Sequence, residues 1–207
     1  MPRKKRPLER GNEFVRDAIL IVIASEDEFA VELYFERFKT SRLKFRVLPT
    51  NDGRSSPQDI SNRLDEFRAE FSLNEDDQLW FCGDVDHWAQ PNHIPNLTAV
   101  LQHCRQCRYQ VALSNPCFEL WLLLHFVDQP SIPEAPCSGI AAELRQAAAG
   151  YSKSGGCGSP LTTDMVHDAI RRAKTLDTDP SDIPARPMTR VYRIVEELLK
   201  RQAIELH

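Results

Sequence analysis

The chain has 207 residues, 42% of them hydrophobic, and a formal net charge of −4 at pH 7. This size and composition allow one sizeable core, and they exclude both a disordered chain and a protein that coats nucleic acid indiscriminately. The longest apolar run, Ala18 to Ala24, has seven residues, far short of the roughly 20 that span a bilayer. We therefore expect a cytoplasmic protein without a membrane segment.

The first half of the chain alternates apolar strands with amphipathic helices. Strands are predicted at 18–24, 45–48, 78–82 and 109–113, and helices at 28–40, 57–71 and 96–108. Ser56 followed by Pro57 is a typical helix start, and the first strand is apolar on both faces, as expected between two helical layers. The β-α-β-α-β-α-β order predicts an α/β fold with a mainly parallel, Rossmann-like sheet of about four strands.

A strongly apolar segment, 117–127, follows the fourth predicted strand. It is predicted to be a buried helix capped by Asn115, with His125 as a hydrogen-bonded core residue. A proline-rich linker is predicted at 128–138, and further helices at 140–149, 162–174 and 189–202. The resulting domain prediction is a basic tail (1–17), an α/β domain (18–127) and a helical C-terminal region (128–207) packed on it.

Acidic residues follow two of the predicted strands where those strands end. Glu26 follows the first strand, and Asp84-Val85-Asp86 follows the third. In an extended chain, residues two apart point the same way, so Asp84 and Asp86 can share one divalent cation. Ligands of an open α/β sheet bind beyond the carboxyl ends of its strands, so the sequence predicts a metal site formed by Glu26, Asp84 and Asp86. A solvated turn is the alternative for a lone Asp-x-Asp.

Two further residues are candidates for the same site. Glu119 lies about one turn into the buried helix, where its charge needs a partner: a metal ion, Lys153 or an arginine of the C-terminal helices. Favourable interaction with the helix N-terminus is an equally good explanation. Lys153 lies in a glycine-rich loop, where it either holds a phosphate or is a solvated surface lysine.

Basic residues are concentrated at the two ends of the chain. Residues 3–10 carry five Lys or Arg against one Glu, and the last third is rich in arginine. Four of these side chains are predicted to contact nucleic-acid phosphates: Arg171, Arg172, Arg190 and Arg193. The alternative is that they belong to solvated helix faces.

The six cysteines are predicted to be reduced, because a chain of this size with strong apolar runs needs no disulfides and an export signal is not evident. The stretch His103-Cys104-Arg105-Gln106-Cys107 resembles half of a zinc site. They lie in a predicted helix, and no second Cys/His pair at ligand spacing follows them. Helical thiols are therefore the preferred interpretation, with zinc as the alternative.

Several segments resemble the RloB family in their residue types. They are Ile21-Val22-Ile23 with Glu26 and Tyr34-Phe35, Asp84-Val85-Asp86, the run Ser-Asn-Pro-Cys-Phe-Glu-Leu-Trp-Leu-Leu-Leu-His-Phe at 114–126, Tyr151-Ser152-Lys153, and Pro187-Met188-Thr189. Together they span about residues 18–199, and the run at 114–126 is highly specific. RloB-like proteins are similar to the Toprim fold of primases, topoisomerases and related nucleases, so the resemblance implies a Toprim-like domain.

The resemblance also implies roles for the acidic residues. In Toprim proteins a glutamate after the first strand acts as general acid/base, and an Asp-x-Asp after a later strand holds magnesium. Glu26 therefore takes the first role, and Asp84 and Asp86 the second. The first motif departs from the family pattern, because Asp27 stands where glycine is usual. Asp27 or Glu28 would compensate by enlarging the group of carboxylates.

The leading hypothesis is a Mg²⁺- or Mn²⁺-dependent phosphodiesterase that cleaves DNA or RNA in prokaryotic anti-phage defence, with Glu26, Glu119 and Lys153 as catalytic residues. The resemblance implies this setting and a partner ATPase, and the chain itself has no Gly-x-x-x-x-Gly-Lys-Ser/Thr loop. The alternative is a non-catalytic Toprim-like module that binds nucleic acid or nucleotide and regulates the ATPase. Strand transfer ranks last, because no tyrosine lies in an evident nucleophile motif.

Overall fold

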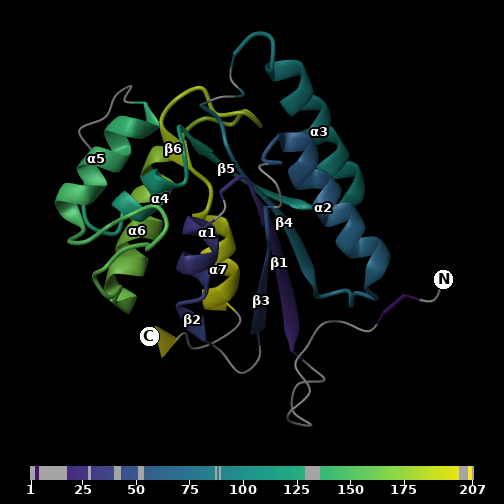
Figure 1. Cartoon of the computed structure of the whole chain (residues 1–207), viewed down its shortest axis with the longest axis horizontal. Helices are drawn as coiled ribbons and strands as arrows, with labels where there is room; N and C mark the ends of the chain where they lie inside the picture. The colour runs from purple at the N-terminus through teal and green to yellow at the C-terminus, as the bar shows by residue number, and fades with distance from the viewer. Residues whose placement is uncertain are drawn as a thin grey trace.

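The computed structural model describes residues 3–4, 18–27, 29–39, 43–50, 54–86, 88, 90–128, 136–200 and 205–206. Its centre is a five-stranded sheet in the order β3-β1-β4-β5-β6 (Figure 1). The strands are β1 (Ile19–Ser25), β3 (Leu43–Leu48), β4 (Gln78–Asp84), β5 (Gln110–Asn115) and β6 (Met188–Thr189). The first four are parallel, and β6 is antiparallel to β5. The α/β class and the mainly parallel sheet are confirmed, and the two-residue strand β6 was not predicted.

Helices cover both faces of the sheet (Figure 1). α2 (Pro57–Glu70) and α3 (Ile94–Cys107) pack on one face, and α1 (Ala30–Phe35), α6 (Thr163–Leu176) and α7 (Tyr192–Lys200) pack on the other. Successive residues of β1 alternate between the two cores: Leu20, Val22 and Ala24 belong to the first, and Ile21 and Ile23 to the second. Burial on both sides explains why this strand is a continuous apolar run.

The remaining elements extend the second layer. α5 (Cys137–Ala147) joins its core, and β2 (Phe38–Lys39) pairs antiparallel with β7 (Glu205–Leu206) in a small separate sheet. Most of the predicted tail at 1–17 and of the predicted linker lies outside the described residues. Among the helices that the structure describes, none has both the length and the apolar character needed to cross a bilayer.

The buried helix after β5 is shorter than predicted and begins differently. α4 spans Glu119–Leu123, because the turns at both of its ends are closed by tighter three-residue hydrogen bonds. Asn115 does not cap this helix, since its side-chain amide donates to the carbonyl oxygen of Pro184 at 2.8 Å. Asp84 takes that place instead: its Oδ1 accepts a hydrogen bond from the backbone NH of Phe118 at 2.9 Å. The prediction of an Asn115 cap was therefore wrong.

His125 is a buried core histidine, as predicted. Its Nδ1 lies 3.0 Å from the carbonyl oxygen of Trp121, and its Nε2 lies 3.2 Å from the hydroxyl of Tyr34. Burial lowers the pKa of His125 to about 4, although hydrogen bonds to the backbone of Trp121 and Leu122 act in the opposite direction. The folded protein therefore holds this imidazole neutral at neutral pH.

Acidification should destabilise the protein through His125. The ordinary pKa of the side chain is 6.5 and its folded value is about 4, so between these values the unfolded chain binds the additional proton. The free energy of unfolding therefore decreases as the pH is lowered through this interval, by about 3 kcal/mol in total. Urea unfolding of the wild type and of His125→Gln between about pH 7 and about pH 4 checks this. The difference in the free energy of unfolding between the two proteins should shrink on acidification. A difference that stays constant with pH would contradict the prediction.

Two of the six cysteines form a disulfide, which corrects the prediction that all are reduced. Cys117 is bonded to Cys137 across a sequence separation of 20 residues. The free thiols are those of Cys82, Cys104, Cys107 and Cys157. The pairing depends on how the start of α5 approaches the start of α4. Sequence spacing does not reveal that approach.

Candidate metal centre

The carboxyl ends of β1 and β4 lie side by side at one edge of the sheet. The two strands pair in parallel with Ser25 opposite Cys82, so the acidic residues that follow them emerge at the same edge. Gly83, the residue before Asp84 in β4, leaves room for the ring of Phe81, because a Cβ atom there would lie 2.8 Å from Cε1 of that ring. The sheet therefore places Glu26 close to Asp84.

Asp84 lies at the centre of a group of carboxylates. Its side chain is half-buried and accepts the hydrogen bond from Phe118 described above. Burial raises the pKa of Asp84 well above its ordinary range, and repulsion raises it further, from the carboxylates of Glu26, Glu119, Asp86 and Asp27. The negative charges are thus close enough to disfavour one another. A bound cation would relieve this repulsion.

Glu119 reaches the same group from the helical layer. It is the first residue of α4, and it is 4% exposed. Its Oε1 accepts a hydrogen bond from the hydroxyl of Tyr151 at 3.3 Å, and its Oε2 lies 3.5 Å from Sγ of Cys137. Burial and the charge of Glu119 raise the pKa of Tyr151, so this hydroxyl keeps its proton and acts as a donor. The sequence pattern had not indicated Tyr151 as a partner.

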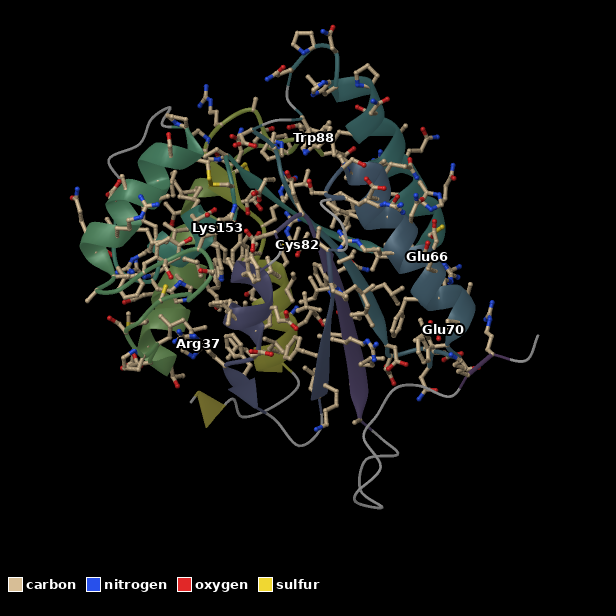
Figure 2. The ribbon with its side chains drawn as sticks, in the orientation of Figure 1. Arg37, Glu66, Glu70, Cys82, Trp88 and Lys153 are labelled. Carbon is tan, nitrogen blue, oxygen red and sulfur yellow. A yellow bond between two sulfur atoms is a disulfide. The ribbon has the colours of Figure 1, made fainter. Side chains whose placement is uncertain are left out.

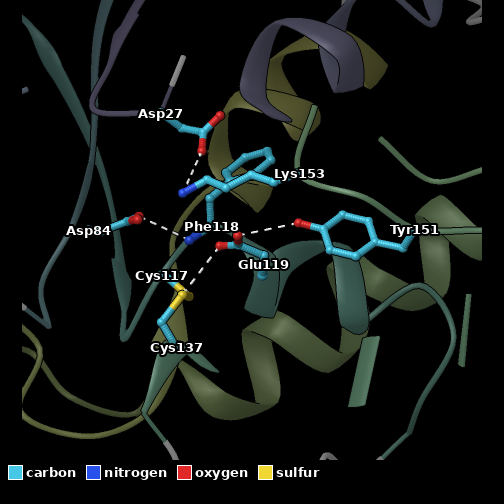
Figure 3. The surroundings of a disulfide bond; sticks show 8 residues. All are labelled: Asp27, Asp84, Cys117, Phe118, Glu119, Cys137, Tyr151 and Lys153. Carbon is cyan, nitrogen blue, oxygen red and sulfur yellow. Dashed lines mark hydrogen bonds and ion pairs between the residues drawn. A yellow bond between two sulfur atoms is a disulfide. The ribbon is translucent and has the colours of Figure 1, made fainter. Parts of the chain in front are cut away.

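Lys153 places a positive charge at the edge of the carboxylates (Figure 3). Its Nζ lies 3.3 Å from Oδ2 of Asp27, and the side chain of Lys153 is 67% exposed while that of Asp27 is 5% exposed. Partial burial lowers the pKa of Lys153, but attraction to Asp27, Glu119 and Asp84 outweighs it, and the pKa is raised. Lys153 is therefore a charged side chain that reaches the carboxylates and remains open to solvent.

Asp27 has a second role at the start of α1. Its Oδ1 accepts hydrogen bonds from the backbone NH groups of Phe29, at 2.8 Å, and Ala30. This is the arrangement of a helix N-terminal cap, and it leaves Oδ2 for the ion pair with Lys153. The aspartate at the usual glycine position thus starts a helix and also belongs to the carboxylate group.

Glu26 and Asp86 lie in different surroundings. The indole NH of Trp88 donates to Oε2 of Glu26 at 3.1 Å, and Figure 2 shows Trp88 beyond Cys82 in the direction in which the strands end. Asp86 is exposed, and its backbone NH donates to the carbonyl oxygen of Pro116 at 3.2 Å. The carboxylate of Glu26 is therefore held in place, whereas that of Asp86 is accessible.

The donor set suits a hard divalent cation, because carboxylate oxygens are the ligands that Mg²⁺ and Mn²⁺ prefer. The carboxylate oxygens of Glu26, Asp84 and Asp86 do not form a set of three within 4.8 Å of one another. Among the described residues, two other groups have that spacing: Cys117, Glu119 and Cys137, and Asp65, His103 and Cys107. An ion here would therefore draw Asp86 or Glu26 towards Asp84, or it would be bound partly through water, as is usual for Mg²⁺.

The arginines predicted to contact nucleic acid have aspartate partners of their own. On α6, Arg171 and Arg172 lie 3.5 and 2.7 Å from Oδ1 of Asp128, and Arg172 also donates to the carbonyl oxygen of Leu124 at 2.7 Å. Arg171 is 63% exposed, whereas Arg172 is only 10% exposed. Of this pair, Arg171 is the side chain that a phosphate can reach.

The other two arginines share one aspartate. Arg190 is buried, lies 3.2 Å from Oδ1 of Asp177, and donates to the backbone carbonyl oxygens of Asp179 and Asp182. Arg193 is 44% exposed and lies 2.9 Å from Oδ2 of Asp177. The guanidinium of Arg190 is thus engaged inside the fold, while Arg193 faces solvent.

The fold and the site define an α/β protein with a group of carboxylates at the carboxyl edge of a mainly parallel sheet. A family model described as RloB-like protein matches residues 21–198, which is most of the chain, so this protein belongs to the RloB-like family. Searches of curated proteins and of solved structures returned no match. The matched segment includes all the carboxylates described above and Lys153.

Proposed function

We propose that this RloB-like protein is a Mg²⁺- or Mn²⁺-dependent phosphodiesterase that cleaves DNA or RNA. The observation that supports it best is the grouping of carboxylates from β1, β4 and α4 around Asp84, with Lys153 at their edge. Mutually repelling carboxylates favour a divalent cation, and a neighbouring ammonium group suits the phosphate of a substrate. A Toprim-like character of the α/β domain belongs to the same proposal.

Each residue has a separate task in this proposal. Asp84 and Asp86 hold the ion, which would polarise a phosphoryl oxygen and neutralise the charge that develops on it. Glu26, held by Trp88, accepts the proton of the attacking water. Lys153 contacts a phosphate oxygen. Glu119, held by Tyr151, adds negative charge beside the ion.

The proposed setting is prokaryotic anti-phage defence in the cytoplasm, with an ATPase encoded nearby as partner. It is supported by membership of the RloB-like family together with the resemblance of that family to Toprim nucleases. An assay of the purified protein on DNA and RNA substrates with Mg²⁺, Mn²⁺ or chelator tests the central activity. Cleavage only with a divalent ion is the expected result.

A non-catalytic module that binds nucleic acid or nucleotide and regulates an ATPase is the second candidate. The spacing of Glu26, Asp84 and Asp86 favours it, because their carboxylate oxygens do not all lie within 4.8 Å of one another, as the ligands of a preformed catalytic ion would. This function requires nucleic-acid or nucleotide binding without cleavage. Absence of cleavage by the wild type on every substrate, with binding retained, would favour this candidate over the phosphodiesterase.

Affinity for nucleic acid should fall steeply with salt concentration and depend on Arg171 and Arg193. Each arginine that binds a phosphate releases counterions, so Arg171→Gln with Arg193→Gln should weaken binding and reduce the salt slope by about one for each of the two side chains. Fluorescence anisotropy at several salt concentrations measures both quantities. Arg105→Gln is the matched control, because this exposed arginine lies on α3, in the other helical layer. Equal slopes for the double variant and the wild type would show that the two arginines are only solvated.

A further inference from the structure

Asp65, His103 and Cys107 bring three different ligand types together on the surface of the α2–α3 layer. We propose that they bind one divalent transition metal of the zinc class, at a site separate from the carboxylate centre. Asp65 belongs to α2, and the other two residues belong to the second half of α3. One ligand atom from each lies within 4.8 Å of the other two.

The distances in this group suit a metal with tetrahedral geometry. His103 and Cys107 are four residues apart on one helix, so their side chains lie on the same face. Nε2 of His103 lies 3.6 Å from Sγ of Cys107 and 2.8 Å from Oδ2 of Asp65. Usual zinc bond lengths give about 3.5 Å between nitrogen and sulfur and about 3.3 Å between nitrogen and oxygen. The distances from His103 to the other two ligand atoms therefore need to change by only about half an ångström.

One neighbouring side chain, that of Tyr109, contacts two of the ligands. The hydroxyl of Tyr109 donates to Oδ1 of Asp65 at 2.7 Å, which leaves Oδ2 for the ion. The rings of His103 and Tyr109 also make an edge contact, with their centroids 6.3 Å apart. Outer partners of this kind orient metal ligands and typically contribute ten- to a hundredfold in affinity, roughly.

The site is open enough for an ion to enter. The side chains of Asp65 and His103 are each 38% exposed, and Cys107 is half-buried. Among the free cysteines that the structure describes, Cys107 is the one that is not fully buried. The adjacent Cys104 is fully buried and belongs to the core beneath α2 and α3. Cys104 is therefore not accessible as a ligand, and the fourth position falls to water.

The ligand chemistry separates this site from the carboxylate centre. Imidazole and thiolate select zinc-class metals, whereas all-oxygen sites select Mg²⁺ and Mn²⁺. Asp65 comes from α2 and the other ligands from α3, so a bound ion would link the two helices that cover one face of the sheet. We therefore assign the ion a stabilising role in this layer.

Titration of the non-reduced wild-type protein with Co²⁺, a spectroscopic substitute for zinc, tests the site. A sulfur-to-cobalt charge-transfer band at one equivalent is expected, since only a thiolate ligand produces it. Cys107→Ser should abolish the band, and His103→Ala should weaken Co²⁺ binding strongly. Tyr109→Phe should keep the band while lowering affinity about tenfold, as expected for a residue that positions Asp65.

Two controls keep the test specific. His167→Ala, at an exposed position of α6, should bind like the wild type. Asp84→Asn should keep the band, since the sulfur atoms of Cys117 and Cys137 beside the carboxylate centre are joined in a disulfide and supply no thiolate. Zn²⁺ should raise the melting temperature of the wild type and of Asp84→Asn, and the rise should be absent in Cys107→Ser. A missing band in the wild type, or a band that survives Cys107→Ser, would overturn the proposal.

Discussion

Replacement of Asp84 or Asp86 by asparagine should abolish metal binding and cleavage together, whereas Glu26→Gln should keep most of the metal affinity and lose cleavage. The aspartates are assigned ligand charge, and Glu26 is assigned proton transfer. Glutamine is nearly isosteric with glutamate but cannot accept the proton, so the rate should fall by roughly a hundredfold or more. Calorimetry with Mg²⁺ and a nuclease assay on the same three variants separate these roles.

Asp164→Asn is the matched control for loss of a negative charge. This exposed residue lies in the first turn of α6, apart from the strand ends, and its variant should behave like the wild type. Loss of metal binding in Glu26→Gln would make Glu26 a ligand instead of a base. Full cleavage by Asp84→Asn would contradict the assignment of this residue as the centre of the site.

Without divalent ions, Asp84→Asn should be more stable than the wild type, and Mg²⁺ should reverse this order. Asparagine removes a charge that burial and the other carboxylates disfavour, and its Oδ1 still accepts the hydrogen bond from Phe118. We expect a gain on the order of 1–2 kcal/mol in the free energy of unfolding. Mg²⁺ stabilises the wild type alone, because only its folded state binds the ion. Thermal unfolding in chelator and in excess Mg²⁺ measures both effects.

The difference in stability between the wild type and Asp84→Asn should depend on pH, and the raised pKa of Asp84 determines the direction. The ordinary pKa of an aspartate is 3.8, and that of Asp84 is raised in the folded state. Between the two values the folded protein holds more protons than the unfolded chain, so the contribution of Asp84 to stability falls as pH rises. The effect of His125 has the opposite sign and cancels when Asp84→Asn is compared with the wild type. Asp76→Asn, at an exposed position before β4, is the control, and a less stable Asp84→Asn protein in chelator would contradict the prediction.

Much of the parallel sheet could be predicted from sequence, because its strands are short apolar runs separated by helical patterns. β1 and α2 are the clearest cases: burial on both faces makes 18–24 continuously apolar, and Ser56 caps α2 by accepting a hydrogen bond from the backbone NH of Asp59 at 3.2 Å. The two-residue strand β6 has no such pattern. Its place depends on pairing with the end of β5.

The site could be predicted only as far as the strand ends determine it. Parallel strands bring Glu26 and Asp84 to one edge regardless of the loops, so the topology was sufficient there. Asp27, Trp88 and Tyr151 take part through contacts that depend on where loops and α1 fold. Of these three residues, only Asp27 was indicated by the sequence, because it is an acidic residue directly after Glu26.

The contacts that sequence patterns missed join segments far apart along the chain. Asp84 satisfies the NH of Phe118, 34 residues away, and thereby replaces the expected local cap at Asn115. Asp65 completes a group with His103 from 38 residues away, so the third ligand was invisible to a search for local metal-ligand spacing. The sequence pattern of one helix or strand indicates which of its residues are buried and how its ends are capped. It does not indicate which other helix or strand lies beside it.

The most direct measurement is the location of Mn²⁺ in crystals of the wild-type protein by anomalous diffraction. We predict an ion bound by carboxylate oxygens of Asp84 and Asp86, with Glu26 beside it. An ion found only at Asp65, His103 and Cys107, or no ion at the carboxyl ends of β1 and β4 in excess Mn²⁺, would contradict this prediction.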